Sequence, residues 1–339
     1  MSLAPRRAAA LTLALLIVIA TGCAGATDPE APLDYAGTAY ELAGAETLDE
    51  SPPQELPGLH NVYRLSGQII SGSEPQGIDA FAQLADMGVK TILSVDGKRP
   101  DADTAAQHGL RYVHIPIQYK GIADDELAAI TKTFRELEGP FYVHCFHGRH
   151  RGPAAAAVGR VVVDGASRQT ALAEMRQWCG TAEEYEGLYA TVASAPLPDA
   201  DATATLAFDF PVAHTLEGVR GVMIPVPRAH DNLKALAKRG WATDPEHPDV
   251  DPLNEAEILA ELFDALQAQP DSGDKPDDYQ AYMQDARSAT DQLVEALRSG
   301  RDGLSPHDTL EGEPRERADA AMAGIKTSCK SCHAGYRDN

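Results

Sequence analysis

The chain has 339 residues, which is enough for two ordinary domains. Its 51 acidic residues outnumber 29 Lys and Arg, giving a formal net charge of -22. No long basic run offsets this charge, which argues against a nucleic-acid-binding protein and against a surface for anionic membranes.

Residues 1–23 have the pattern of a lipoprotein-type signal peptide. Arg6 and Arg7 precede an apolar run from Ala8 to Ala20, and Cys23 follows shortly after. The run is shorter than the roughly 18 to 20 residues that span a bilayer, which favours a signal peptide over a retained transmembrane anchor. The segment resembles a bacterial lipobox. This resemblance implies lipidation of Cys23, a membrane attachment through that lipid, and an extracytoplasmic (periplasmic) location.

The next two segments differ in their apolar patterning. Residues 24–58 are rich in Ala, Gly, Pro, Asp and Glu without an apolar period, which predicts a flexible tether. Residues 59–194 alternate short β-like runs with helical stretches, which predicts an α/β domain with a central, mostly parallel sheet. We expect strands at 62–65, 68–70, 90–95, 111–117 and 141–143, and helices at 78–87, at 125–137 and from about Pro153.

A Pro-, Ala- and Asp-rich stretch at residues 195–206 predicts a linker, and residues 207–339 are predicted to be all-α. Apolar residues spaced by three and four predict helices near 258–266, 279–296 and 318–336. A further helix within 219–241 should be broken or kinked by Pro225 and Pro227. Together these segments predict a four-helix bundle.

The run Cys329-Lys330-Ser331-Cys332-His333 predicts covalent attachment of heme c. Two thiols at positions i and i+3 lie on one helix face, so both can add to the vinyl groups of one porphyrin while the imidazole ligates its iron. The alternatives are half of a zinc site or a terminal disulfide. No second Cys/His pair with ligand spacing is present to complete a zinc site.

The heme run lies on the last predicted helix, and in this position it resembles the C-terminal end of class II cytochromes c, the cytochrome c-prime family. The resemblance implies a four-helix bundle with Cys329 and Cys332 as thioether anchors and His333 as the proximal iron ligand. In that family the first helix supplies either Met, giving an electron carrier, or an apolar residue, leaving a gas-binding iron. Met223 is the candidate sixth ligand, with His230 as a second candidate, although each is more often simply a core or surface residue. An electron carrier would need a redox partner, whose identity the residues do not indicate.

The segment from His144 to Gly152 joins the predicted strand 141–143 to the following helix. A strand, a tight loop and a helix N-terminus direct backbone N–H groups at one point, which makes an anion site. These dipoles would stabilise a Cys145 thiolate, and Arg151 could hold two oxygens of a phosphate. The residues predicted to surround the phosphate are Phe146, His147, Gly148, Arg149, His150 and Arg151.

This loop resembles the signature of the dual-specificity and related protein tyrosine phosphatases, and the likeness extends over residues 60–194. The resemblance implies that Cys145 attacks the phosphorus of a phosphorylated substrate to form a phosphocysteine, while Arg151 holds the phosphoryl oxygens. Two positions depart from the family pattern. Gly152 stands where Ser or Thr is usual, and Gln118-Tyr119-Lys120 occupies the expected place of the Asp general acid.

Asp124 and Asp125 are the candidates for that general acid, and they also fit the acidic first turn of the next helix. A missing acid typically costs roughly 10²- to 10⁴-fold in rate. Two functions therefore stay open. One is an exported heme protein that hydrolyses phosphate monoesters, and the other is a cytochrome whose phosphatase-like domain binds an inorganic anion or a partner without turnover. Cys179 either is a buried small hydrophobe or forms a disulfide with Cys145.

Overall fold

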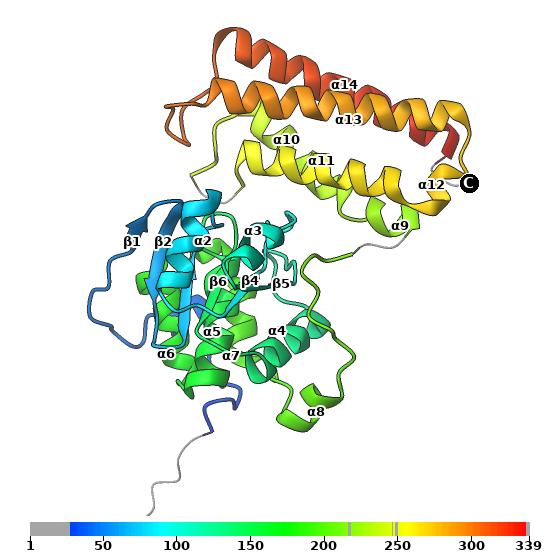
Figure 1. The fold of residues 1–339 in the computed structure, drawn as a ribbon. Helices are drawn as coiled ribbons and strands as arrows, with labels where there is room; N and C mark the ends of the chain where they lie inside the picture. Colours follow the sequence, from blue (N-terminus) through cyan, green and yellow to red (C-terminus); the bar gives the residue numbers. More distant parts are fainter. Residues whose placement is uncertain (1–27, 216–217, 246, 248–249, 337–339) are drawn as a thin grey trace, which may run out of the picture.

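The structure is a computed structural model that describes residues 28–215, 218–245, 247 and 250–336. The described chain forms a mixed α/β domain and a helical region (Figure 1). The predicted signal peptide, including the predicted lipidation site Cys23, lies outside the described residues. Among the helices that the structure describes, none is both long and apolar enough to cross a membrane.

Within the described residues, a six-stranded sheet with the order β1-β2-β3-β6-β4-β5 forms the centre of the α/β domain. The four strands β3, β6, β4 and β5 run parallel, and the antiparallel strands β2 and β1 extend one edge. The strands are β1 Gln54–Leu56, β2 Leu59–Arg64, β3 Ile69–Gly72, β4 Thr91–Ser94, β5 Arg111–His114 and β6 Phe141–His144. The predicted α/β domain is confirmed, with a mixed sheet whose centre is parallel.

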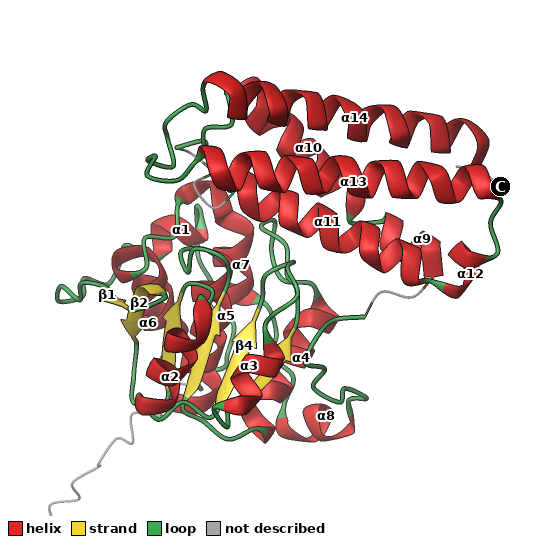
Figure 2. Ribbon diagram, turned by 45° about the horizontal axis from the view of Figure 1, so that its top comes forward, coloured by secondary structure: helices red, strands yellow, loops and turns green. Residues whose placement is uncertain are grey.

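Helices cover both faces of this sheet (Figure 2). Val143 packs in a core with α4 to α7, whereas its neighbour Tyr142 packs with α2 and α3, because successive strand side chains point to opposite faces. The helices are α1 Ala39–Leu42, α2 Gly77–Asp86, α3 Ala102–Gln107, α4 Asp124–Glu136, α5 Arg151–Asp164, α6 Arg168–Ala173, α7 Glu186–Ser194 and α8 Ala200–Thr205. A π-helical turn, Glu174–Trp178, and a 3-10 turn, Glu183–Tyr185, lie between α6 and α7.

The described part of the predicted tether, residues 28–58, packs on the α/β domain. Ala39 and Ala43 are fully buried in the core that contains α6 and α7. The Arg168 guanidinium donates to the Glu30 carbonyl oxygen through Nε at 3.1 Å and Nη2 at 2.7 Å. This packing differs from the predicted flexible tether. The buried residues of the segment are too few and too irregularly spaced to form an apolar period, so the sequence pattern did not indicate their burial.

The predicted linker, residues 195–206, also belongs to the α/β domain. Lys132 Nζ on α4 donates to the Thr203 carbonyl oxygen at 2.7 Å, which fixes α8 beside α4. Farther along, the His114 N–H at the end of β5 donates to the Pro211 carbonyl oxygen at 2.9 Å. The α/β domain therefore continues past the predicted boundary.

The helical region packs around its own apolar core, with α10 and α11 nearer to the α/β domain than α13 and α14 (Figure 1). Its helices are α9 Gly218–Met223, α10 Val226–Lys238, α11 Pro252–Ala268, α12 Pro270–Gly273, α13 Asp277–Gly300 and α14 Gly312–Tyr336. The break predicted at Pro225 separates α9 from α10, because proline has no N–H to donate. Trp241 is fully buried and its indole N–H donates to Asp319 at 2.8 Å, which ties the end of α10 to α14.

Candidate active site and candidate heme pocket

The loop between β6 and α5 has a shape that depends on Gly148. This residue has a φ of +72°, and a Cβ here would lie 2.2 Å from the carbonyl carbon of Gly72 on β3. Helix α5 begins at Arg151, two residues before the predicted start at Pro153, so its first turn belongs to the loop. Cys145 is almost fully buried at the base of this loop. The N-terminus of a helix thus lies beside a cysteine, as an anion site requires.

Arg151 is buried, and its contacts among the described residues include Asp96 and Tyr119. Its guanidinium forms an ion pair with Asp96, donates to the Tyr119 hydroxyl at 2.6 Å, and lies 4.1 Å from the centre of the Tyr119 ring. Asp96 also accepts the backbone N–H of Phe146 at 3.2 Å. Burial by itself would raise the pKa of Asp96, but the Arg151 guanidinium and the N–H groups of Lys98 and Phe146 hold this pKa below its usual value.

Sequence reasoning did not find Asp96, although its position carried a signal. Asp96 follows β4, and the carboxyl ends of parallel strands are where open α/β sheets bind ligands. The same edge holds His114 and His144, which are buried at the ends of β5 and β6. Burial lowers the pKa of each imidazole to about 4, so both are neutral at pH 7. They fix the backbone, since the His114 ring donates to the Asp96 carbonyl oxygen at 2.8 Å.

Some of the predicted site residues have structural contacts of their own. Arg149 is exposed and donates to the Asn61 side chain at 3.3 Å, and the His150 ring packs 4.3 Å from the centre of the Tyr185 ring. Asp124 is exposed in the first turn of α4 and is not among the residues that line the cavity described next.

A cavity of about 840 Å³ lies between the Arg151 side of the loop and helices α9 to α11. The α/β domain contributes Arg151, Tyr119 and Glu126 to its lining, and the helical region contributes Arg228 and Glu255. The Arg228 guanidinium on α10 lies 5.0 Å from the centre of the Tyr119 ring, which belongs to the α/β domain. Arg151, the member of the candidate phosphate site that lines this cavity, therefore faces the helical region.

Two polar contacts hold α11 against the segment after β4. Lys98 Nζ lies 2.7 Å from Glu257 Oε2 on α11 and 3.4 Å from Glu74 Oε1 in the α/β domain. One residue later, the Arg99 N–H donates to the Glu261 carboxylate at 2.7 Å. Helix α11 thus forms one wall of the cavity.

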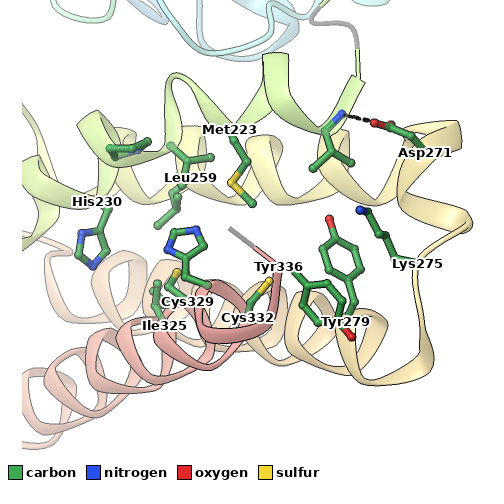
Figure 3. Close-up of a pocket in the computed structure, with 14 residues that line it drawn as sticks. Met223, His230, Leu259, Asp271, Lys275, Tyr279, Ile325, Cys329, Cys332 and Tyr336 are labelled. Carbon is green, nitrogen blue, oxygen red and sulfur yellow. Dashed lines mark hydrogen bonds between the residues drawn. The ribbon is translucent and has the colours of Figure 1, made fainter. Parts of the chain in front are cut away.

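A second cavity, of about 590 Å³, lies inside the helical region beside the predicted heme residues (Figure 3). Cys329, Cys332 and His333 line it from α14, and Met223 and His230 line it from α9 and α10. Figure 3 shows the side chain of Met223 across the cavity from both cysteines. The Nε2 atom of His230 is buried and has no hydrogen-bond partner among the described residues. The structure therefore brings together every residue that was predicted for the heme.

The rest of this cavity is mainly apolar, with polar groups near one end. Its apolar lining consists of Val219, Val226, Pro227, Leu259 and Ile325. Lys275 and Asp271 lie near its end at α12 (Figure 3). Among the residues that the structure describes, no group of three or more His, Cys, Asp or Glu side chains lies close enough to hold a metal ion.

No protein-family model matches the chain. Two curated relatives are dual specificity protein phosphatases named TpbA, from Pseudomonas aeruginosa strains UCBPP-PA14 and PAO1. They are 32% identical over 141 residues and 31% identical over 140 residues, which is 40% of this chain in each case. The chain contains a phosphatase-like domain. The match spans 64% and 63% of the two relatives, a little under two thirds of their length.

Solved structures of similar proteins include that of P. aeruginosa TpbA, which has 29% sequence identity and a TM-score of 0.36. This match covers 41% of the chain and 87% of the TpbA structure. A putative phosphatase from Shewanella putrefaciens CN-32 has 18% identity and a TM-score of 0.33, with 42% of this chain and 97% of that one covered.

Proposed function

We propose that the α/β domain is a cysteine-dependent phosphatase that hydrolyses phosphate monoesters. One observation carries this proposal. Cys145 lies at the base of a strand-loop-helix junction whose helix begins with the buried Arg151, in a domain similar in sequence to a dual specificity phosphatase. The Cys145 thiolate attacks phosphorus to form a phosphocysteine and release an alcohol, and water then releases phosphate.

The neighbours of Cys145 have defined tasks in this reaction. The N–H groups of the loop and of the first turn of α5 stabilise the thiolate and the phosphoryl oxygens. Asp96 holds Arg151 beside the loop, where a bidentate guanidinium can hold two of these oxygens. A Cβ at Gly152 would lie 3.0 Å from the Cys145 nitrogen, so the glycine at this position lets α5 approach the loop closely.

Hydrolysis of para-nitrophenyl phosphate by the purified full chain tests the proposal. We expect Cys145→Ser to abolish turnover, and we expect Cys179→Ala, the matched control at the other buried cysteine of this domain, to retain it. Turnover that survives Cys145→Ser would contradict the assignment. Phosphate binding by the natural chain without any turnover would favour the alternative, an anion- or partner-binding domain.

We further propose that the helical region is a heme c domain of the cytochrome c-prime type. Cys329 and Cys332 would form the thioethers, and His333 would ligate the iron. The proposal is supported by the cavity, which is lined by two thiols and an imidazole from α14 and is otherwise mainly apolar. The buried, unpartnered Nε2 of His230 is a further nitrogen at this cavity. A bound heme supplies an iron that exchanges one electron with a redox partner or binds a gas.

The test is expression with the heme-maturation machinery followed by a pyridine-hemochrome spectrum. We expect covalent heme in the natural chain and none after replacement of both Cys329 and Cys332 by Ser. The visible spectrum with and without carbon monoxide, repeated for Met223→Ala and His230→Ala, identifies the sixth ligand. Absence of covalent heme from the correctly exported natural chain would contradict this proposal.

The cellular setting is part of the same proposal, namely export to the periplasm and anchoring in a membrane through a lipid on Cys23. Partition of the natural chain into the detergent phase, lost on Cys23→Ser, would support it. Recovery of both chains from the aqueous phase would contradict the lipid anchor.

A further inference from the structure

Transfer of a phosphoryl group to Cys145 needs an acid that protonates the departing oxygen when the leaving group is poor. The α/β domain offers few candidates for this acid. Of the described cavity-lining residues in this domain, Glu126 alone carries a carboxyl group. Its carboxylate accepts the Ala123 N–H at 2.8 Å, as a residue of the first turn of α4. Asp96 is ionised by its pairing with Arg151 and therefore has no proton to give.

The helical region brings three carboxyl groups of α11 to the same cavity, those of Glu255, Glu261 and Asp264. Glu261 accepts the Arg99 N–H and Asp264 pairs with Arg287, whereas Glu255 interacts electrostatically with Arg151. Glu255 lies near the start of α11 and lines the cavity together with Arg151, although Glu255 is only 4% exposed. Its side chain is hydrogen-bonded to that of Asn232 on α10. The charged groups that act on it are Arg151 and Asp96 from the α/β domain and Arg228 from α10.

Building on the proposed phosphatase function, we propose that Glu255 is the general acid of this site, supplied to the α/β domain by the helical region. The position expected for an acid after β5 holds Gln118 and Tyr119, so the acid comes from the opposite wall of the cavity. Helix α11 is held in place for this role by the contacts of Glu257 with Lys98 and of Glu261 with Arg99.

The protonation state of Glu255 suits this role. Burial raises the pKa of its carboxyl to about 7, although the hydrogen bond with Asn232 and the positive charges of Arg151 and Arg228 oppose the rise. The negative charge of Asp96 adds to it. A general acid works best when its pKa lies near the working pH, because it is then protonated and still a ready donor.

The proton and electron pairs balance over the two steps. The Cys145 thiolate forms the S–P bond while the P–O bond to the leaving group breaks, and the proton of Glu255 goes to the departing oxygen. This step yields an alcohol, the phosphocysteine and the Glu255 carboxylate. The carboxylate then takes a proton from the water that attacks phosphorus, which releases phosphate and regenerates both the thiolate and the protonated acid.

Kinetics of the full chain on two substrates test this role, because only a poor leaving group needs the proton. For Glu255→Gln we expect kcat/KM, which reports the formation of the phosphocysteine and not its hydrolysis, to fall by about 10²- to 10⁴-fold on phenyl phosphate and to change by less than about threefold on para-nitrophenyl phosphate. The natural chain should lose kcat/KM on phenyl phosphate as the pH rises through about 7, where Glu255 loses its proton. This loss should disappear in Glu255→Gln.

Two further variants separate a proton donor from a structural contact. Glu255→Asp keeps a carboxyl group, so it should retain the decline of kcat/KM at high pH, with a lower kcat/KM. Glu295→Gln makes the same change at an exposed residue of α13 that does not line the cavity, so it should keep the leaving-group dependence of the natural chain.

The outcomes distinguish this inference from the phosphatase proposal beneath it. If Cys145→Ser abolishes turnover but Glu255→Gln keeps the natural kcat/KM and pH profile on phenyl phosphate, the inference is wrong and the phosphatase proposal stands. A higher kcat/KM of Glu255→Gln on both substrates would also overturn it, since the carboxylate would then block the site. Absence of Cys145-dependent turnover in the natural chain would overturn both.

Discussion

Replacing Asp96 by Asn would remove the carboxylate charge that pairs with the buried Arg151 guanidinium. The two side chains are 5% and 4% exposed, so water screens their pairing weakly. Removing one partner of a buried ion pair typically costs about 3 to 5 kcal/mol. Because Tyr119 keeps its hydroxyl and ring contacts with Arg151, we expect a loss at the lower end, about 3 kcal/mol at pH 7.

The pH dependence of this loss follows from the lowered pKa of Asp96 in the folded chain. The unfolded chain binds a proton to this carboxyl near its ordinary pKa of about 3.9. The stabilisation is therefore fully present above that pH and is lost as the pH falls through the lower pKa of the folded state. The difference between the natural chain and Asp96→Asn should be largest at neutral pH and should shrink below about pH 4.

Urea denaturation measures this difference, with hydrogen exchange of the β6 amides as a local readout. Asp86→Asn, an exposed change on α2, is the control and should alter stability by less than about 0.5 kcal/mol. A loss below about 1 kcal/mol for Asp96→Asn at pH 7 would refute the reasoning, because such a value is typical of an exposed pair. A loss that stays constant down to pH 3 would refute its electrostatic origin.

Three further substitutions test other parts of the structure. Gly148→Ala places a Cβ against the backbone of β3 at a positive φ. We expect the free energy of unfolding, measured by thermal denaturation, to fall by about 1 to 3 kcal/mol or more, and the turnover of aryl phosphate to fall with it. Trp241→Phe removes the hydrogen bond to Asp319 and should lower the stability of the helical region by about 1 to 3 kcal/mol, measured by hydrogen exchange of α14. Tyr119→Phe keeps the ring beside Arg151 but loses the hydrogen bond between the Arg151 guanidinium and the hydroxyl, so KM for aryl phosphate should rise about fivefold. An unchanged KM would show that this hydroxyl does not position the guanidinium.

Several elements were predictable because their signals are local. The apolar run at Phe141–His144 is a buried strand, and the loop after it could be placed between this strand and a helix. Pro225 ended a helix as its chemistry requires. The helix α13 was visible in the spacing of its buried residues, which repeats on one face.

Segments without a period were not predictable in the same way. Residues 28–58 were expected to be a flexible tether, yet Ala39 is fully buried and the Glu30 carbonyl is bound by Arg168. An alanine that contacts a distant helix looks the same in the sequence as an alanine in a linker. Its burial depends on a surface that only the folded domain provides.

The sequence by itself indicated the proposed reactive groups of this protein, because the proposed nucleophile and the proposed heme anchors have their characteristic neighbours close by in the chain. Cys145 with Arg151 and the run from Cys329 to His333 are examples. Only the tertiary structure decided which carboxyl groups meet these sites. Asp96 is 55 residues away from Arg151 along the chain, and Glu255 belongs to another folding unit. Such contacts depend on how strands and helices pack, since each carboxyl gains its altered pKa from burial and from charges that are distant in sequence.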